Sequence, residues 1–332
     1  TRLTIRNAGG KDPGTSERSY LLVPRAKTLP ENPSGLPVIR TPVRKVVVME
    51  TVHIGYLDAL NALDAIAGAA TTDYISNPTI KAGLEDGAIT ALEAGQAVDV
   101  ERLLLLQPDL VLTSVSGNPS FDAPAKLKRT GLPVLVTAAH KEAHPLARME
   151  WIRCYGALVN REAEARAWFR RTAKRYRAFR EKAADAPASP TVFCGAPYSG
   201  TWHMPGGGSY TAQLIADAGG DYLWADNDAR GSLPLDLERV FYRAADARFW
   251  INPGAYRSLD ALYAADPRFR RFRAARRGNV HNNTRQVPRG GTGNPVWERG
   301  VVRPDAMLGD LVKILHPKRA KAHKFVFYEK LE

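Results

Sequence analysis

Asp99-Val-Glu101-Arg102 is matched further along the chain by Asp236-Leu-Glu238-Arg239, and in both copies a second aspartate and an apolar, strand-like run follow. The first aspartate of each copy stands where a helix N-cap belongs, and its carboxylate can accept backbone N–H bonds there. The glutamate falls in the first helical turn, where the helix dipole stabilises negative charge. Because Glu101 and Glu238 occupy the same place in both copies, the pattern also indicates an outward-facing role shared by two similar lobes.

Polar and aromatic side chains follow the ends of several expected strands. In open parallel sheets, ligands bind beyond the carboxyl ends of the strands. This rule nominates as ligand-binding residues His53, Tyr74, Ser114, Ser116, Trp202, His203, Tyr210, Asn252, Asn282, Asn283 and Arg285. Trp202 lies in a glycine-rich loop, where its ring can stack on a flat ligand or pack in the core. Trp297 is a further candidate, which lines the same cleft or anchors its own loop.

Other side chains near these loops allow alternative chemistry. Arginine guanidinium groups can hold anionic oxygens or remain solvated, and four of them cluster in the sequence: Arg285, Arg289, Arg299 and Arg303. Imidazoles near strand ends could ligate a bare ion such as zinc or manganese, although a dedicated zinc site needs three or four convergent ligands; they belong to His53, His140, His203 and His281. The sequence has no G-x-S-x-G elbow, no HExxH motif and no glycine fingerprint after the first strand, so it favours neither an enzyme nor a cofactor.

The elements that would position these residues alternate between strand and helix. Residues 44–49 are a nearly continuous apolar run typical of a strand buried on both faces of a parallel sheet. Such alternation favours an α/β fold of two Rossmann-like lobes with mostly parallel sheets. We predict an N-terminal arm with a β-hairpin at residues 1–40, an N-terminal α/β lobe at 41–144, bridging helices at 145–186 and a C-terminal α/β lobe at 187–332. One stripe predicts the buried face of the second bridging helix: Ala165, Phe169, Thr172, Tyr176, Phe179 and Ala183.

Composition limits the class of protein. A chain of 332 residues favours two domains, and its 44% hydrophobic and 24% charged content is ordinary for a globular protein. The net charge of +13 would suit a nucleic-acid binder, but the basic residues are concentrated between Arg161 and Lys182, which indicates one solvated helix face and no nucleic-acid partner. No run of about 18 apolar residues is present, so we expect no membrane span. The first residues lack the apolar segment of a signal peptide, which fits a cytosolic chain or an exported chain already processed.

Taken together, these features resemble the solute-binding proteins of ABC importers for ferric siderophores, haem and cobalamin. The resemblance covers residues 44 to 317, and its most specific part runs from Asp99-Val-Glu101-Arg102 to Gln107-Pro-Asp109-Leu-Val-Leu112. The matching Glu238 and the bridging helix add to it, whereas residues 244–247 lack the proline of the first copy. The loop at residues 51–55 also departs from the family pattern, so ligand contacts there are not carried over.

The resemblance implies a fold and a role. Two α/β lobes would be joined by a long rigid α-helix, and a metal chelate, above all a ferric siderophore, would bind between them. Haem, cobalamin, a bare metal ion or an enzymatic function on the same fold remain alternatives. In the family, one acidic residue per lobe docks onto arginines of the permease, and by residue match these would be Glu101 and Glu238. The resemblance also implies a monomer that needs no cofactor and acts in the periplasm or on a lipid anchor.

Overall fold

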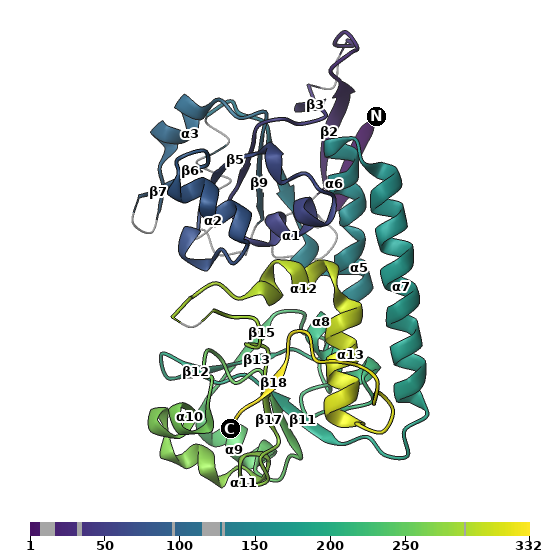
Figure 1. The fold of residues 1–332 in the computed structure, drawn as a ribbon, viewed down its shortest axis with the longest axis vertical. Coiled ribbons are helices and arrows are strands. Elements are labelled where there is room, and N and C mark those ends of the chain that lie inside the picture. The colour runs from purple at the N-terminus through teal and green to yellow at the C-terminus, as the bar shows by residue number, and fades with distance from the viewer. Residues whose placement is uncertain (7–16, 32–34, 95–96, 115–126, 128–129, 289) are drawn as a thin grey trace. The chain divides into compact units, whose positions relative to one another are not determined.

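The computed structural model describes residues 1–6, 17–31, 35–94, 97–114, 127, 130–288 and 290–332. The chain forms two compact units (Figure 1). Unit 1 consists of Thr1–His140, Glu150–Phe169 and Pro288–Val302, and unit 2 consists of Lys141–Met149, Arg170–Val287 and Arg303–Glu332. The long helix α7 (Glu162–Ala184) therefore contributes to both units. Residues 288–302, which the sequence interpretation grouped with the C-terminal lobe, belong to unit 1.

The strands and helices of unit 1 are short, and after residue 48 they mostly alternate along the chain. Its strands are β1 (Arg2–Arg6), β2 (Glu17–Pro24), β3 (Val38–Thr41), β4 (Val46–Val48), β5 (Ile66–Ala69), β6 (Thr90–Ala91), β7 (Glu93–Ala94), β8 (Ala97–Val98), β9 (Leu110–Ser114) and β10 (Val134–Thr137). Its helices are α1 (Val52–Ala59), η1 (Leu63–Ala65), η2 (Thr72–Tyr74), α2 (Pro78–Glu85), α3 (Val100–Leu106), α6 (Ile152–Val159), η5 (Pro295–Trp297) and α12 (Arg299–Val302). Two more helices lie where the chain leaves the unit: η3 (Ala139–Lys141) and α5 (Pro145–Glu150).

Unit 2 repeats this alternation. Its strands are β11 (Thr191–Cys194), β12 (Pro197–Tyr198), β13 (Thr201–Pro205), β14 (Asp221–Tyr222), β15 (Ser232–Leu235), β16 (Phe249–Ile251), β17 (Val280–Asn282) and β18 (Glu329–Lys330). Its helices are α8 (Tyr210–Asp217), α9 (Leu237–Ala244), α10 (Leu259–Ala265), η4 (Pro267–Arg271), α11 (Arg273–Arg276) and α13 (Pro304–Leu315).

Each unit is built on a five-stranded sheet. The order in unit 1 is β10-β9-β4-β5-β6, and all of its strand pairs are parallel. The order in unit 2 is β14-β11-β16-β17-β18, which is parallel except for the edge strand β18. The first apolar run lies in the centre of its sheet, as expected for a strand buried on both faces, since Val46, Val47 and Val48 are at most 1% exposed. The predicted α/β class with mostly parallel sheets in two lobes is confirmed.

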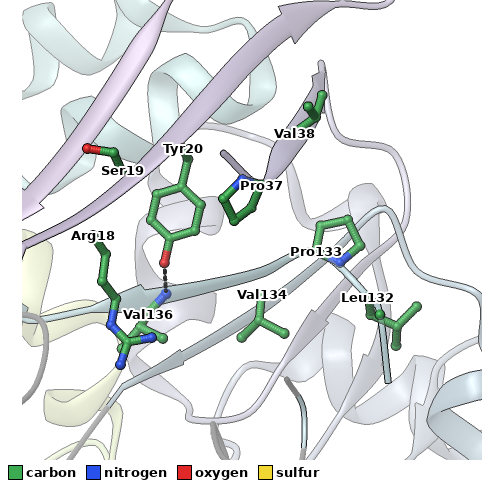
Figure 2. Close-up of a pocket in the computed structure, with 10 residues that line it drawn as sticks. Arg18, Ser19, Tyr20, Pro37, Val38, Leu132, Pro133, Val134 and Val136 are labelled. Carbon is green, nitrogen blue, oxygen red and sulfur yellow. Dashed lines mark hydrogen bonds between the residues drawn. The ribbon is translucent and has the colours of Figure 1, made fainter. Parts of the chain in front are cut away.

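The described N-terminal strands β1, β2 and β3 pack on the core of unit 1. Strand β2 pairs antiparallel with β1 and parallel with β3, and Ile5, Leu22 and Ile39 are buried with the core of the unit. The Tyr20 hydroxyl accepts a hydrogen bond of 3.1 Å from the backbone N–H of Val136 in β10 (Figure 2). A pocket of about 460 Å³ lies beside this contact, between β2 and β10. The N-terminal strands thus cover part of an edge strand that would otherwise be open to pairing with another chain.

The predicted stripe of α7 is buried at four of its six positions, and Phe169 and Phe179 are partly buried. Ala165, Thr172, Tyr176 and Ala183 are at most 3% exposed, whereas the arginine and lysine residues of the helix are exposed. In unit 2 the Tyr176 hydroxyl donates a hydrogen bond of 2.7 Å to Asp217. The basic residues of α7 therefore form a solvated face, and the opposite face carries the packing.

A buried carboxylate in α13 holds the C-terminal segment of unit 2. Asp310 is 0% exposed and accepts backbone hydrogen bonds from Val326, Phe327 and Tyr328 at 2.7–3.1 Å. The His323 ring lies 2.6 Å from the same carboxylate through Nε2. This group therefore fixes the segment that leads into strand β18.

Candidate functional site

The switch point of the unit 1 sheet lies between β4 and β9. From β4 the chain builds outward through β5 and β6 and then returns to add β9 and β10 on the other side. Glu50 follows the carboxyl end of β4, and Ser114 is the last residue of β9. Ligands of open α/β sheets bind at such a point. These two residues therefore mark the candidate ligand-binding edge of unit 1.

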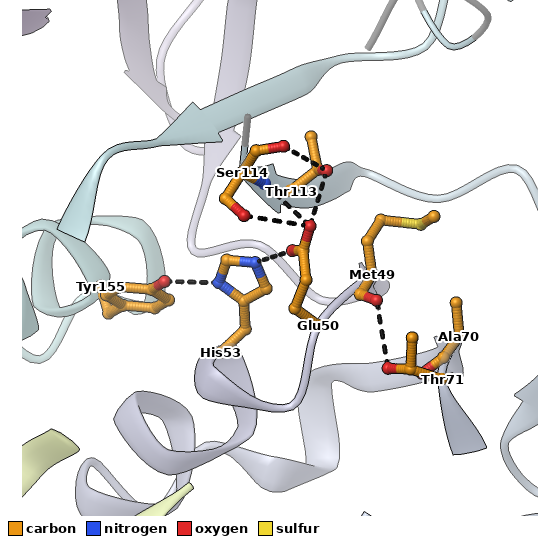
Figure 3. A network of polar contacts seen from close by, with 8 residues as sticks. All are labelled: Met49, Glu50, His53, Ala70, Thr71, Thr113, Ser114 and Tyr155. Carbon is orange, nitrogen blue, oxygen red and sulfur yellow. Dashed lines mark hydrogen bonds and ion pairs between the residues drawn. The ribbon is translucent and has the colours of Figure 1, made fainter. Parts of the chain in front are cut away.

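A continuous polar network occupies this edge (Figure 3). Glu50 Oε1 accepts hydrogen bonds from Thr113 Oγ1 at 3.2 Å, Ser114 N at 3.1 Å and Ser114 Oγ at 3.2 Å. Its Oε2 lies 2.7 Å from His53 Nε2, and His53 Nδ1 lies 2.6 Å from the Tyr155 hydroxyl. Because a carboxylate only accepts, a neutral His53 donates through Nε2 and accepts from Tyr155 through Nδ1. Burial raises the pKa of Tyr155 far above its ordinary value, so its hydroxyl keeps its proton.

The network changes the role expected for His53. His53 is 0% exposed and both of its ring nitrogens have protein partners, so it orients Glu50 and presents no free nitrogen to a ligand. The Glu50 side chain is 35% exposed and is the accessible acid of the group. Sequence reasoning passed over Glu50, although its place just after the first apolar strand was a usable signal. Ser114 joins the network, and Ser116 lies outside the described residues.

Two exposed aromatic residues of unit 1 lie on segments that are tied together. Tyr74, which follows the carboxyl end of β5, is 63% exposed, and Trp297 is 49% exposed. Between them, the buried Glu298 carboxylate accepts hydrogen bonds of 2.6 Å from both Ser76 N and Ser76 Oγ. Burial raises the pKa of Glu298, and the bonds from Ser76 oppose that rise. Both rings are therefore displayed to solvent from anchored backbone.

The segment that carries Trp297 also packs closely on its neighbours in unit 1. Thr292 Oγ1 donates to the Asp73 carbonyl, and a Cβ added at Gly293 would overlap the backbone of Ile75. A Cβ at Gly55 in α1 would likewise overlap the carbonyl of Glu298. Figure 1 shows the consequence, with α12 next to α1 although they come from opposite ends of the chain.

The tryptophans of unit 2 have a structural role. Trp202 is 0% exposed and packs against Phe193, Trp250 and Phe272. Its Nε1–H donates to the Cys194 carbonyl at 2.8 Å, at the carboxyl end of β11. The expectation that Trp202 stacks on a ligand does not hold in this structure, because alternation along β13 turns its ring toward the core.

The three asparagines proposed as ligand-binding residues are largely enclosed. Asn282 is 0% exposed and donates through Nδ2 to the carbonyls of Gly254 at 3.0 Å and Tyr256 at 2.6 Å. Asn283 is 8% exposed, and Asn252 is partly buried in a left-handed conformation with φ 52°. Asn282, at the end of β17, therefore holds the loop after β16 and does not project into solvent.

Only some of the proposed ligand-binding residues of unit 2 are accessible to solvent. His203 lies on the outer side of β13, and Arg285 is also exposed. Tyr210, at the start of α8, is partly buried, and the Arg148 guanidinium lies 4.4 Å from its ring centroid. Tyr198 is 76% exposed in the neighbouring strand β12 and was not singled out from the sequence. These strands and loops of unit 2 therefore offer a ligand mainly aromatic and cationic side chains.

The predicted arginine cluster is only partly available. Arg303 is held by Asp305, with Nε and Oδ1 3.0 Å apart, and Arg175 of α7 binds the other oxygen of Asp305 at 2.6 Å. Arg285 and Arg299 are exposed, whereas Arg289 lies outside the described residues. Asp305 therefore joins α13 to α7 within unit 2, and Arg303, which is paired with the same carboxylate, is not free to hold a ligand.

The described part of the chain holds no group of three or more His, Cys, Asp or Glu side chains suited to a metal ion. His281 is 8% exposed, and its burial and the charge of Lys330 lower its pKa to about 4. The sequence argument took no close histidine pair such as HxxxH to be present, but His140 and His144 have this spacing. His144 Nδ1 accepts a hydrogen bond from Leu146 N at 3.0 Å, and its Nε2 lies 3.5 Å from Asp217.

The two copies of the acidic motif have the same local structure. Asp99 caps α3 by accepting from Arg102 N at 3.0 Å, and Asp236 caps α9 by accepting from Arg239 N at 2.6 Å. Glu101 and Glu238 stand in the first turns of these helices and are exposed. Within the described part of the chain the Glu238 carboxylate lies 3.5 Å from Arg268, an exposed pair that water screens. Each unit therefore presents a carboxylate on a capped helix.

Comparison with known proteins identifies the class. The family model for periplasmic binding proteins matches residues 46–284, and the chain belongs to this family. It is 25% identical over 305 residues to an uncharacterized lipoprotein of Methanocaldococcus jannaschii, covering 88% of this chain and 70% of the relative. A periplasmic heme-binding protein from Pseudomonas aeruginosa has a TM-score of 0.64 at 18% identity, over 87% of this chain and 98% of that one. An ABC-type Fe³⁺-hydroxamate transport protein from Saccharomonospora viridis has a TM-score of 0.60 at 20% identity, over 80% and 93%.

Family membership confirms part of the sequence interpretation. The chain is a binding protein of the periplasmic family, and it is not an enzyme. The solved structures share its fold. None of the described helices is both long and apolar enough to span a membrane.

Proposed function

We propose that the protein captures a ferric siderophore or a related metal chelate outside the cytoplasmic membrane and delivers it to the permease of an ABC importer. The observation that supports this choice of ligand is a pair of exposed aromatic residues in unit 1, Tyr74 and Trp297, whose backbone is anchored. Aromatic rings fixed in this way suit a bulky ligand with flat, partly apolar faces. A bare ion offers no such surface.

Charge in unit 2 supports the same class of ligand. Arg285 is exposed, and Arg148 lies over the Tyr210 ring. Guanidinium groups bind carboxylate and other anionic oxygens with directed hydrogen bonds, and such oxygens surround ferric iron in siderophores and occur as propionates in haem. The names of the Pseudomonas and Saccharomonospora proteins point to iron-containing ligands of these two kinds.

Calorimetric titration of the purified protein tests the cargo. The probes are a ferric hydroxamate, a ferric catecholate, haemin, cyanocobalamin, and Zn²⁺ and Mn²⁺ without chelator. We expect one chelate class to bind in a 1:1 ratio with a Kd of roughly micromolar or tighter and to be recovered chemically unchanged. If a bare ion binds and no chelate does, the protein is a metal-ion carrier instead. If only haemin or only cobalamin binds, that compound replaces the ferric siderophore as the proposed ligand.

The aromatic pair gives a direct prediction. The double variant Tyr74→Ala/Trp297→Ala should bind the chelate about 10- to 100-fold more weakly, because each aromatic contact contributes on the order of 1 kcal/mol beyond the area it buries. Its melting temperature should stay close to that of the wild type, since both side chains are about half exposed or more. Tyr242→Ala removes an exposed aromatic ring from a helix of unit 2 and serves as the matched control. Unchanged affinity in the double variant would remove Tyr74 and Trp297 from the ligand site.

We assign delivery to Glu101 and Glu238. Their equal positions on capped helices give two carboxylates for a two-point contact with cationic groups of the permease, and such charge pairs fix orientation and partner choice. An extracytoplasmic location, in the periplasm or on a lipid anchor, follows from this role. The lipoprotein of Methanocaldococcus jannaschii is consistent with it.

A further inference from the structure

Each helix of the repeated motif carries a large apolar side chain on the same face as its glutamate. Leu105 follows Glu101 by about one turn in α3, and Tyr242 follows Glu238 by about one turn in α9. Residues four apart are neighbours on a helix surface. We propose that Leu105 and Tyr242 are docking residues that pack against apolar surface of the permease beside the two glutamates. This inference rests on the proposed function and extends it to residues outside the acidic pair.

The exposure of the two side chains argues that the fold does not need them. Leu105 is 84% exposed and Tyr242 is 94% exposed. The opposite faces of the helices supply the packing, since Leu103 in α3 and Val240 in α9 are 0% exposed. Apolar side chains displayed at equivalent places in two units form a repeated surface, and tyrosine in particular is enriched among residues that dominate binding at interfaces.

The charge of the protein and the repeat of the motif in both units indicate which partner these surfaces bind. A second copy of this chain would bring together two proteins that each carry a net charge of +13, which opposes association. Glu101 and Glu238 require a cationic partner, and the neighbouring apolar side chains require a recess that excludes water. A motif displayed once on each unit fits a partner with two like surfaces. Docking therefore requires a permease with two like surfaces, each presenting basic residues beside an apolar pocket.

Docking and chelate binding are measured separately. The importer complex is held in nanodiscs, and binding of the protein is followed by biolayer interferometry for Leu105→Ala, Tyr242→Ala and the double variant. We expect docking to weaken about five- to tenfold for each single change and roughly 50-fold for both, as for side chains that anchor an interface. Titration with the ferric hydroxamate or haemin and the melting temperature should match the wild type.

Conservative variants and a distant leucine are the controls. Leu105→Met and Tyr242→Phe keep an apolar group of similar size and should dock nearly as the wild type does. Leu29→Ala removes a 62% exposed leucine from another surface of unit 1 and should have no effect. Docking of the double alanine variant at wild-type strength would overturn the inference, as would sedimentation that finds a dimer lost in that variant. If the wild-type protein binds a chelate but never docks on the importer, the docking assignment is wrong. If it docks but binds no chelate, only the proposed ligand is wrong.

Discussion

Replacement of Glu101 and Glu238 together by alanine is expected to stop uptake of the chelate while its binding in solution stays as in the wild type. The caps of α3 and α9 come from Asp99 and Asp236, so both helices remain intact without the glutamates. Loss of one partner of a charge pair that docking buries costs about 2–5 kcal/mol. The loss of two pairs should weaken docking at least about a thousandfold. Uptake of a radiolabelled chelate is measured in cells whose own gene is replaced by each variant, and chelate affinity is measured by calorimetry.

A matched control separates docking from a general effect of charge. Glu162→Ala removes an exposed carboxylate from the first turn of α7, a comparable helix position that lies outside the repeated motif. This variant should take up the chelate normally, and the single variants at positions 101 and 238 should be intermediate. Normal uptake by the double variant would show that the two glutamates do not dock. A loss of chelate affinity would move them into the ligand site.

The sequence predicted the repeated motif well because capping is a local interaction. An aspartate cap, its backbone donor and the exposed glutamate lie within four residues in each copy, so the pattern contains all of the partners. The second aspartates show the limit of this logic. Asp109 accepts from the backbone N–H groups of Arg44 and Lys45 at 2.8 and 3.1 Å, whereas Asp246 is exposed. Their different surroundings depend on residues far away in the sequence.

The candidate ligand residues were harder to predict for the same reason. The strand-end rule points to one edge of each sheet, but it does not tell which side chains turn inward. His53 is enclosed because Tyr155, a hundred residues further on, contacts its ring. Trp202 is enclosed because the aromatic residues around Phe272 complete the core of unit 2. Tyr74 and Trp297 remain exposed, and their anchoring through Glu298 involves contacts that no local pattern contains.

A large loss of stability is expected for Asp310→Ala. This carboxylate is the acceptor for the backbone N–H groups of Val326, Phe327 and Tyr328, and the last two residues are at most 2% exposed. Water cannot readily replace the acceptor at such a site, and an unsatisfied buried donor costs about 1–3 kcal/mol. We expect the free energy of unfolding of unit 2 to fall by about 3–5 kcal/mol and its melting temperature to fall by about 10 °C.

Calorimetric melting and hydrogen exchange distinguish this effect from a general loss of negative charge. The amides of residues 326–328 should exchange much faster in Asp310→Ala, because they lose their acceptor, while those of the unit 1 sheet should not change. Asp310→Asn keeps one acceptor oxygen and should be intermediate. Asp246→Ala removes an exposed aspartate from the same unit and should change stability by less than about 0.5 kcal/mol. If Asp310→Ala melted like the wild type, the C-terminal segment would be held by its apolar side chains, and the buried carboxylate would contribute little to the stability of unit 2.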